Sequence, residues 1–192
     1  LNEAFKTSGQ VQFVCRAGNF KKRGLEYTGA LKVLRVMMGY DYLWNNVRVK
    51  GGAYGCMSSF MRNGDCFFVS YRDPNLQKTI DVYENTGEYL RNFVADERTL
   101  TQYIIGTISE VDAPLSPAAY GAYCLNAYLS DVTEEMIQKD REEILNVTEK
   151  DIQKLAEYVD AFLEEKCICV VGTTPKIEES KELFTTVDSL FH

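Results

Sequence analysis

The sequence predicts an α+β fold in which helices cover one face of a mostly antiparallel sheet. Three observations predict it. Short β-rich segments stand in the first third of the chain and near its C-terminus, an Asn-Gly turn joins two of them, and amphipathic helices fill the middle. The chain has 192 residues, of which 45% are hydrophobic and 26% charged, as in ordinary globular proteins. We therefore expect residues 1–192 to form a single domain.

The first third of the chain predicts a strand, a helix and a glycine-rich loop. Residues 11–15 are rich in β-forming side chains and are followed by Gly18, where the strand is expected to stop. Thr28 can cap a helix whose apolar residues recur at helical spacing: Leu31, Leu34, Met38 and Tyr42. We expect this helix to end before residues 47–49, because Lys50-Gly51-Gly52 interrupts the pattern.

A β-hairpin is the clearest local prediction. Residues 54–62 and 65–72 flank Asn63-Gly64, the dipeptide that best suits a two-residue type I′ turn. In that register the facing pairs are Arg62 with Asp65, Phe60 with Phe67, Ser58 with Val69, and Cys56 with Tyr71. The same register puts Cys56 and Cys66 on opposite faces of the hairpin, where they cannot form a disulfide.

The next ninety residues are predicted to be helical. Apolar spacing predicts helices over residues 76–94, 97–111, 117–129, 134–145 and 149–164. Thr148 and Asp151 predict a capping box at the start of the last of these. Residues 167–171 then predict an apolar strand that ends at Gly172, and a final helix is expected after Pro175.

Charge and residue counts exclude several classes of function. The chain carries a net charge of −7, which repels phosphate backbones, so we expect no nucleic-acid partner. No apolar run is long enough to span a membrane, and no membrane partner is expected. The six cysteines contain no C-x-x-C pair, and we expect them to be reduced and mostly buried in a cytoplasmic protein. His192 is the single histidine, so this chain alone cannot supply a histidine-based catalytic site or zinc site.

One segment combines glycines, a cation and a phenol. In Arg48-Val49-Lys50-Gly51-Gly52-Ala53-Tyr54-Gly55, Arg48 offers a planar fork of donors for a carbonyl or carboxylate, and Tyr54 offers one hydroxyl. Gly51 and Gly52 allow close approach of the backbone to a ligand, or positive φ. The structural alternative is a glycine kink that enters a strand, with Arg48 merely solvated. A phosphate loop is disfavoured, since neither phosphate-binding glycine motif is present.

This segment resembles a known family. Together with the hairpin, with Ser70-Tyr71-Arg72-Asp73-Pro74-Asn75 and with Val147-Thr148-Glu149-Lys150-Asp151-Ile152, it resembles the C-terminal domain of presequence-protease-type zinc peptidases, in the pitrilysin/insulinase (inverzincin) group. The resemblance extends from about residue 10 to residue 190. It implies a metallopeptidase LuxS/MPP-like domain, the last domain in the second half of a larger peptidase that closes around a peptide chamber.

The resemblance also implies roles for the candidate residues. The zinc ligands, an H-x-x-E-H helix and a downstream Glu, belong to the N-terminal half of the same polypeptide, so zinc is expected only in the full-length enzyme. Arg48, Gly51, Gly52 and Tyr54 would bind the peptide substrate. Tyr54 would also stabilise the oxyanion that forms when zinc-activated water attacks the scissile carbonyl. The isolated chain is expected to bind no metal and to cleave no peptide.

Two other interpretations stay open. The chain could be a non-catalytic peptide-binding or assembly module of the same fold, or a small-ligand enzyme built around the glycine segment. It begins Leu1-Asn2-Glu3 without a methionine, so we expect a fragment of a longer polypeptide, whose upstream targeting segment would not be visible. An H-x-x-E-H motif upstream would favour the peptidase over the non-catalytic module.

Overall fold

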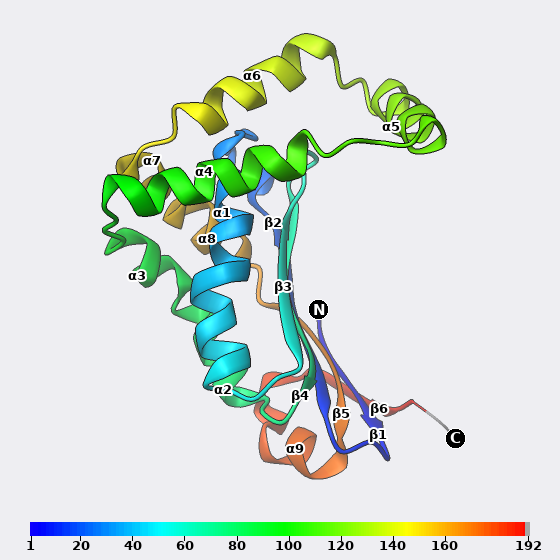
Figure 1. Ribbon diagram of the computed structural model, residues 1–192. Coiled ribbons are helices and arrows are strands. Elements are labelled where there is room, and N and C mark those ends of the chain that lie inside the picture. Colours follow the sequence, from blue (N-terminus) through cyan, green and yellow to red (C-terminus); the bar gives the residue numbers. More distant parts are fainter. Residues whose placement is uncertain (191–192) are drawn as a thin grey trace.

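The computed structural model describes residues 1–190, which form a six-stranded sheet with helices packed on one face (Figure 1). The strands lie in the order β3-β4-β2-β5-β1-β6. Their bounds are Asn2–Thr7 for β1, Gln12–Asn19 for β2, Gly55–Phe60 for β3, Asp65–Asp73 for β4, Cys167–Thr173 for β5 and Thr186–Ser189 for β6. The strands β3, β4, β2 and β5 pair antiparallel, whereas β1 runs parallel to both β5 and β6. The predicted α+β class is confirmed, but the sheet is mixed rather than mostly antiparallel.

The parallel ladders come from two strands that the sequence did not predict. In β1 only Ala4 is buried, and in β6 no residue is buried, so neither strand carries a regular alternation of apolar and polar residues. Both strands form by pairing with an exposed strand edge: β1 pairs with the free edge of β5, and β6 pairs with the free edge of β1. The strand predicted over residues 11–15 also continues through Gly18 to Asn19, since β4 and β5 pair with it on both sides.

Most of the predicted helices are present in the structure. The helices are α1 (Ala30–Met37), α2 (Gln77–Glu84), α3 (Thr86–Arg91), α4 (Glu97–Val111), α5 (Pro117–Leu129), α6 (Glu134–Leu145), α7 (Glu149–Lys154), α8 (Ala156–Leu163) and α9 (Thr174–Glu179), with 3-10 turns η1 (Phe20–Arg23) and η4 (Lys181–Leu183). The predicted bounds of α4, α5 and α6 are confirmed. The helices predicted over residues 76–94 and 149–164 each divide in two, at Asn85 and Leu155. The predicted capping box is present: Thr148 Oγ1 accepts from Asp151 N at 3.3 Å, and Asp151 Oδ2 accepts from Thr148 N at 3.1 Å.

The first long helix does not end where the sequence predicted. Beyond α1 it continues as two π-helical segments, η2 (Met38–Tyr42) and η3 (Trp44–Val49), so Arg48 is helical and does not lie in a loop. The backbone amide of Lys50 donates to the carbonyl of Asn45 at 3.0 Å, five residues back, which is the wider π-helical bond. The wider turn keeps Leu43 and Val47 buried, and that burial extends the helix past the point at which the glycines interrupt its pattern.

The hairpin of β3 and β4 is present, but its predicted register is wrong by one residue. Phe60 faces Cys66, and Ser58 faces Phe68. Gly64 has φ +96 while Asn63 has an ordinary negative φ, so a type I′ turn, which needs positive φ at both residues, cannot form. Instead the loop has three residues, with Met61 N donating to Asp65 O at 2.8 Å and Gly64 N to Met61 O at 2.9 Å.

A tertiary contact explains this choice of turn. Asn19, at the end of β2, donates from Nδ2 to Asp65 Oδ1 at 2.8 Å and to Asn63 O at 3.3 Å, and Phe20 N donates to Gly64 O at 3.1 Å. The slip by one residue exchanges the faces of one strand. Cys56 and Cys66 therefore lie on the same face, contrary to the prediction. They are still too far apart to bond, because Cys66 faces Phe60, four residues from Cys56 along β3.

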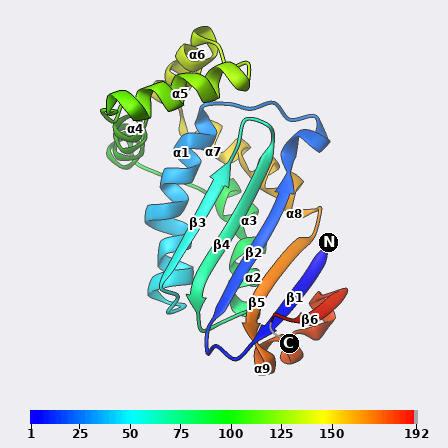
Figure 2. The same cartoon turned by 90° about the vertical axis from the view of Figure 1, so that its right-hand side faces the viewer.

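The two faces of the sheet differ. One face is buried under the helices, where Val14, Phe68 and Val170 pack with Phe162 of α8 in the main core. The opposite face is open, and Figure 2 looks directly onto it. On this open face Met57, Val69, Cys15 and Cys169 form one row of cross-strand neighbours. Within residues 1–190, no helix is both long and apolar enough to cross a membrane.

Candidate functional site

Arg48 lies near the end of η3, with its guanidinium over the ring of Trp44. The guanidinium carbon is 4.0 Å from the centroid of the indole, within the range of a cation–π contact. Trp44 precedes Arg48 by four residues, so helical geometry places both side chains on one face. Across residues 1–190, Arg48 makes no ion pair, which leaves its donors available to a ligand.

Gly51 and Gly52 end the π-helical segment. Gly52 has φ +82, and its amide donates to Arg48 O at 2.8 Å, while the amide of Ala53 donates to Val47 O at 3.2 Å. This is a Schellman-like cap. A Cβ on Gly51 would lie 2.3 Å from the carbonyl oxygen of Val47. The close backbone approach predicted at these glycines is therefore made to the preceding helical turn.

Tyr54 follows the cap and lies directly before β3, with 61% of the residue exposed. Two side chains from β4 contact its ring. The ring of Tyr71 meets it edge to face with centroids 5.5 Å apart, and the guanidinium carbon of Arg72 lies 5.7 Å from its centroid. The backbone amide of Tyr54 also donates to Arg72 O at 3.3 Å. The phenol is thus held at its ring, while its hydroxyl makes no hydrogen bond to any described residue.

The loop after β4 forms hydrogen bonds that hold the glycine segment in place. Asn75 Nδ2 donates to the carbonyl oxygen of Gly51 at 2.6 Å. Asp73 is fully buried, and its carboxylate accepts from Asn75 N at 2.8 Å and from Thr79 Oγ1 at 2.7 Å. These hydrogen bonds attach the glycine segment to the β4–α2 connection. They therefore restrict the backbone that carries Arg48 and Tyr54.

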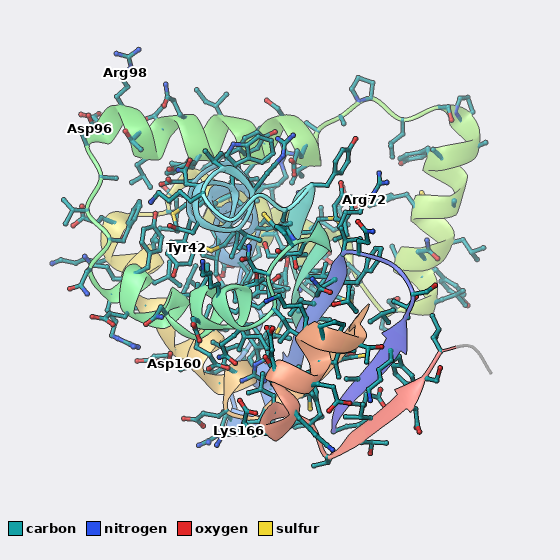
Figure 3. All side chains as sticks on the ribbon, turned by 90° about the horizontal axis from the view of Figure 1, so that it is seen from below. Tyr42, Arg72, Asp96, Arg98, Asp160 and Lys166 are labelled. Atoms are coloured by element: carbon teal, nitrogen blue, oxygen red, sulfur yellow. The ribbon has the colours of Figure 1, made fainter. Side chains whose placement is uncertain are left out.

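The arginines near Tyr54 differ from most others in the chain. Six arginines form ion pairs with carboxylates: Arg16, Arg23, Arg35, Arg62, Arg91 and Arg141. Among the described residues, Arg48, Arg72 and Arg98 form none. Figure 3 shows Arg98 at the start of α4, far from Arg72. Two of the three unpaired guanidinium groups therefore belong to the segments around Tyr54, in a chain with a net charge of −7.

The cysteine beneath this segment is not activated as a nucleophile. Burial raises the pKa of the Cys56 thiol to about 11, and the nearby Asp73 carboxylate adds to the increase, while the Arg48 guanidinium opposes it. A thiol with so high a pKa stays protonated near neutral pH and is a poor nucleophile. The groups at this site that can interact with a ligand are therefore the hydrogen-bond donors of Arg48 and Tyr54.

The residues that the structure describes do not fit the zinc ion that the family resemblance implies. Within residues 1–190, no group of three or more His, Cys, Asp or Glu side chains is arranged to hold a metal ion. The single histidine, His192, lies outside the described residues. Among residues 1–190, the candidate site thus consists of hydrogen-bond donors.

The sequence pattern that defines the PreP C-terminal domain matches residues 2–175. The chain belongs to this family. It is 47% identical over 189 residues to Protein HypA of Clostridium perfringens, covering 98% of this chain and 19% of that protein. It is 40% identical over 178 residues to presequence protease 1, chloroplastic/mitochondrial, of Arabidopsis thaliana, covering 92% of this chain and 16% of that protein. The chain thus spans less than a fifth of the length of these curated relatives.

Solved structures show the same fold as this PreP C-terminal domain. A protease from Helicobacter pylori superposes with a TM-score of 0.65 at 13% identity, covering 88% of this chain and 44% of that chain. A peptidase M16 inactive domain from Pseudomonas fluorescens gives 0.65 at 14% identity, covering 90% and 43%. Pitrilysin gives 0.59 at 13% identity, covering 88% and 19%. The fold expected from the resemblance is confirmed.

The structure adds three side chains to the four predicted residues, which already lie within one segment of the sequence. Trp44 contacts Arg48, and Tyr71 and Arg72 contact Tyr54. The spacing of four between Trp44 and Arg48 was a signal that could have found the first pair. Tyr71 and Arg72 belong to a motif that carries the family resemblance, but their contacts with Tyr54 could not be predicted, because these contacts depend on the pairing of β3 with β4.

Proposed function

We propose that this chain is the substrate-binding C-terminal domain of a zinc-dependent metalloendopeptidase that degrades unfolded peptides. The observation that carries the proposal is that Arg48 and Tyr54, whose side chains make no ion pair or hydrogen bond within residues 1–190, lie on one segment held by hydrogen bonds to the β4–α2 connection. Membership of the PreP C-terminal domain family supports it, as do the presequence proteases among the relatives. The metal ligands of such an enzyme would come from residues outside this chain.

In this proposal each donor has a distinct task. The Arg48 guanidinium hydrogen-bonds a backbone carbonyl of the bound peptide, and its contact with Trp44 restricts its orientation. The Tyr54 hydroxyl donates to the oxyanion that develops when water adds to the scissile carbonyl. Ring contacts hold both side chains in the absence of substrate. The open, partly apolar face of the sheet next to Tyr54 supplies a surface for the side chains of an unfolded peptide.

Steady-state kinetics on the full-length polypeptide test these roles. Tyr54→Phe removes one donor and keeps the ring contacts with Tyr71 and Arg72, so kcat should fall by about 10²–10³ while folding is unchanged. Arg48→Ala should also reduce kcat/KM, with a larger share in KM because Arg48 holds the ground state as well. Arg98→Ala is the matched control, since Arg98 is also exposed and unpaired but lies at α4, and it should leave both constants unchanged.

A folded Tyr54→Phe enzyme with wild-type kcat would refute the catalytic role of Tyr54. Circular dichroism on each variant confirms that the fold is intact. If both Tyr54→Phe and Arg48→Ala behave as wild type, the segment is only a structural kink at the entry to β3.

We infer that the remaining part of the longer polypeptide covers α5. This helix lies apart from the other helices (Figure 1), and it buries none of its residues. It carries no charged residue, and its exposed side chains include Tyr120, Tyr123, Leu125, Tyr128 and Leu129. Monomeric proteins rarely leave such an apolar helix uncovered. The relatives have more than five times the length of the matched region, so the additional chain is available to cover it.

Cys124, which is exposed near the middle of α5, tests this inference. In the isolated chain, Cys124 should react fastest with a thiol reagent and the buried Cys66 slowest, as mass spectrometry of the labelled peptides would show. In the full-length polypeptide Cys124 should be strongly protected. Equal labelling of Cys124 in both proteins contradicts the inference, and concentration-dependent protection in the isolated chain would identify a second copy as the occupant instead.

A non-catalytic peptide-binding or assembly module is the second candidate function. The M16 inactive domain among the structural neighbours shows that the same fold occurs in proteins described as inactive. The two candidates differ in one outcome: a module that only binds peptides would lose affinity in Arg48→Ala but would have no catalysis for Tyr54→Phe to reduce.

A further inference from the structure

Arg72 has a backbone conformation that is unusual for a residue with a side chain. Its φ is +50, in the left-handed region that glycine occupies without strain. It lies at a β-bulge, since Gln12 pairs with Asp73 while Val14 pairs with Ser70, which leaves one extra residue in β4. Bulges of this kind redirect side chains, and strained residues persist where the surrounding structure holds them.

The bulge changes the face to which Arg72 belongs. Along β4 the buried residues alternate as Cys66, Phe68 and Ser70, and a regular strand would place Arg72 next in this buried series. Instead Arg72 is exposed and Asp73 takes the buried position. Figure 3 shows Arg72 on the side of the sheet away from α1. The strained conformation therefore turns the guanidinium out of the core and onto the face next to Tyr54.

The redirected guanidinium has no carboxylate partner among residues 1–190. Its carbon lies 5.7 Å from the centroid of Tyr54, and the adjacent Asp73 carboxylate is already engaged with Asn75 and Thr79. A guanidinium in a cation–π contact of this length keeps its N–H donors free, and those donors match a carboxylate in bidentate geometry. An unpaired cation on an acidic chain, turned outward at a strained residue, indicates a site for an anion brought by a ligand.

We propose that Arg72 is a specificity-determining residue that receives a carboxylate of the bound peptide beside Tyr54. The proposal rests on the proposed function, because it assumes that a peptide lies along Arg48 and Tyr54. The carboxylate comes either from an acidic side chain or from the C-terminus of the peptide. Both sources present the same two oxygens to the guanidinium.

Matched peptides cleaved by the full-length polypeptide test the proposal and separate the two sources. One series replaces a single Glu by Gln at successive positions, and another compares a C-terminal acid with the amide. For the peptide whose carboxylate meets Arg72, the wild type should prefer the carboxylate member by about tenfold or more in kcat/KM. Arg72→Gly should bring this ratio close to one. It should not lower the melting temperature, because glycine relieves the backbone strain at this position.

Lys166 provides the matched control. It is also a cation with positive φ, +51, and it lies after α8, remote from Tyr54. Lys166→Gly relieves comparable strain and removes one charge, so it should leave the carboxylate preference unchanged. If Arg72→Gly fails to fold, Arg72→Asn keeps a residue that tolerates left-handed φ and removes the charge.

The outcomes distinguish this proposal from the one on which it rests. Normal kinetics in both Tyr54→Phe and Arg48→Ala would refute the peptide site itself. Impaired kinetics in those variants, together with no carboxylate preference in the wild type or an unchanged preference in Arg72→Gly, would refute only the role of Arg72. Equal loss of preference in Lys166→Gly would also refute it, because the effect would then come from net charge.

Discussion

Substitution of Gly51 by alanine tests whether the candidate site depends on the helix cap beneath it. The added Cβ would lie 2.3 Å from the carbonyl oxygen of Val47 and 2.9 Å from that of Asn46. Both neighbours are backbone atoms, which cannot rotate away as a side chain would. The substitution must therefore displace the turn that carries Arg48, or break the bonds that Ala53 and Gly52 make to it.

The expected cost follows from this overlap. Ordinary van der Waals contacts of a Cβ begin near 3.4 Å, so the shorter of the two contacts is too close by about 1 Å. Overpacking of this kind costs about 1–3 kcal/mol. For a domain of this size each kcal/mol lowers the melting temperature by about 2–4 °C, so Gly51→Ala should lower it by about 2–12 °C.

Gly39 in η2 is the matched control, because a Cβ there would meet no atom within 4 Å. Gly39→Ala should raise the free energy of unfolding by as much as about 1 kcal/mol, through the better helix propensity of alanine. Thermal denaturation of the 192-residue chain measures the melting temperatures, and urea denaturation measures the free energies of unfolding of both variants. A Gly51→Ala protein as stable as the wild type would show that the cap is not tight and would refute the reasoning.

Two further predictions follow from buried polar groups. Burial, reinforced by the Asp140 carboxylate, raises the pKa of Tyr27 to about 12, so between pH 10 and 12 the unfolded chain loses this proton while the folded chain keeps it. Stability should therefore fall as the pH rises above 10, and Tyr27→Phe should make the fall less steep; an identical slope in melting temperature against pH contradicts this. Arg16 is 2% exposed and donates to Glu84 Oε1 from Nε at 2.9 Å and from one terminal nitrogen at 2.6 Å. Glu84→Gln should cost about 1–3 kcal/mol by leaving that buried cation without an opposite charge, and an unchanged urea midpoint would show that the carbonyls of Leu163 and Cys167, which also accept from Arg16, are sufficient.

The bounds of α4, α5 and α6 could be read from the sequence, because each depends on interactions within the helix. Asp96, Ser116 and Thr133 cap these three helices through bonds to the backbone three residues ahead. The capping box at Thr148 is equally local. Likewise, the grouping of Arg48, Gly51, Gly52 and Tyr54 needed no tertiary information, because seven consecutive residues contain them all.

The features that the sequence did not predict depend on distant partners. The register of β3 and β4 follows from Asn19, which bonds the turn from the end of β2. The strands β1 and β6 follow from the free edges of their neighbours, and the π-helical extension that carries Arg48 follows from the burial of Leu43 and Val47.

The contacts of Tyr54 show the same division most clearly. The sequence alone placed a phenol and a cation six residues apart and identified the family through them. Only the tertiary structure decided that Arg72 reaches the Tyr54 ring, because an extra residue in β4 shifts the side-chain alternation by one. The alternation of buried and exposed residues along a strand does not predict where pairing with a neighbouring strand will insert a bulge. The contact between Arg72 and Tyr54 therefore forms only when β2 and β4 pair.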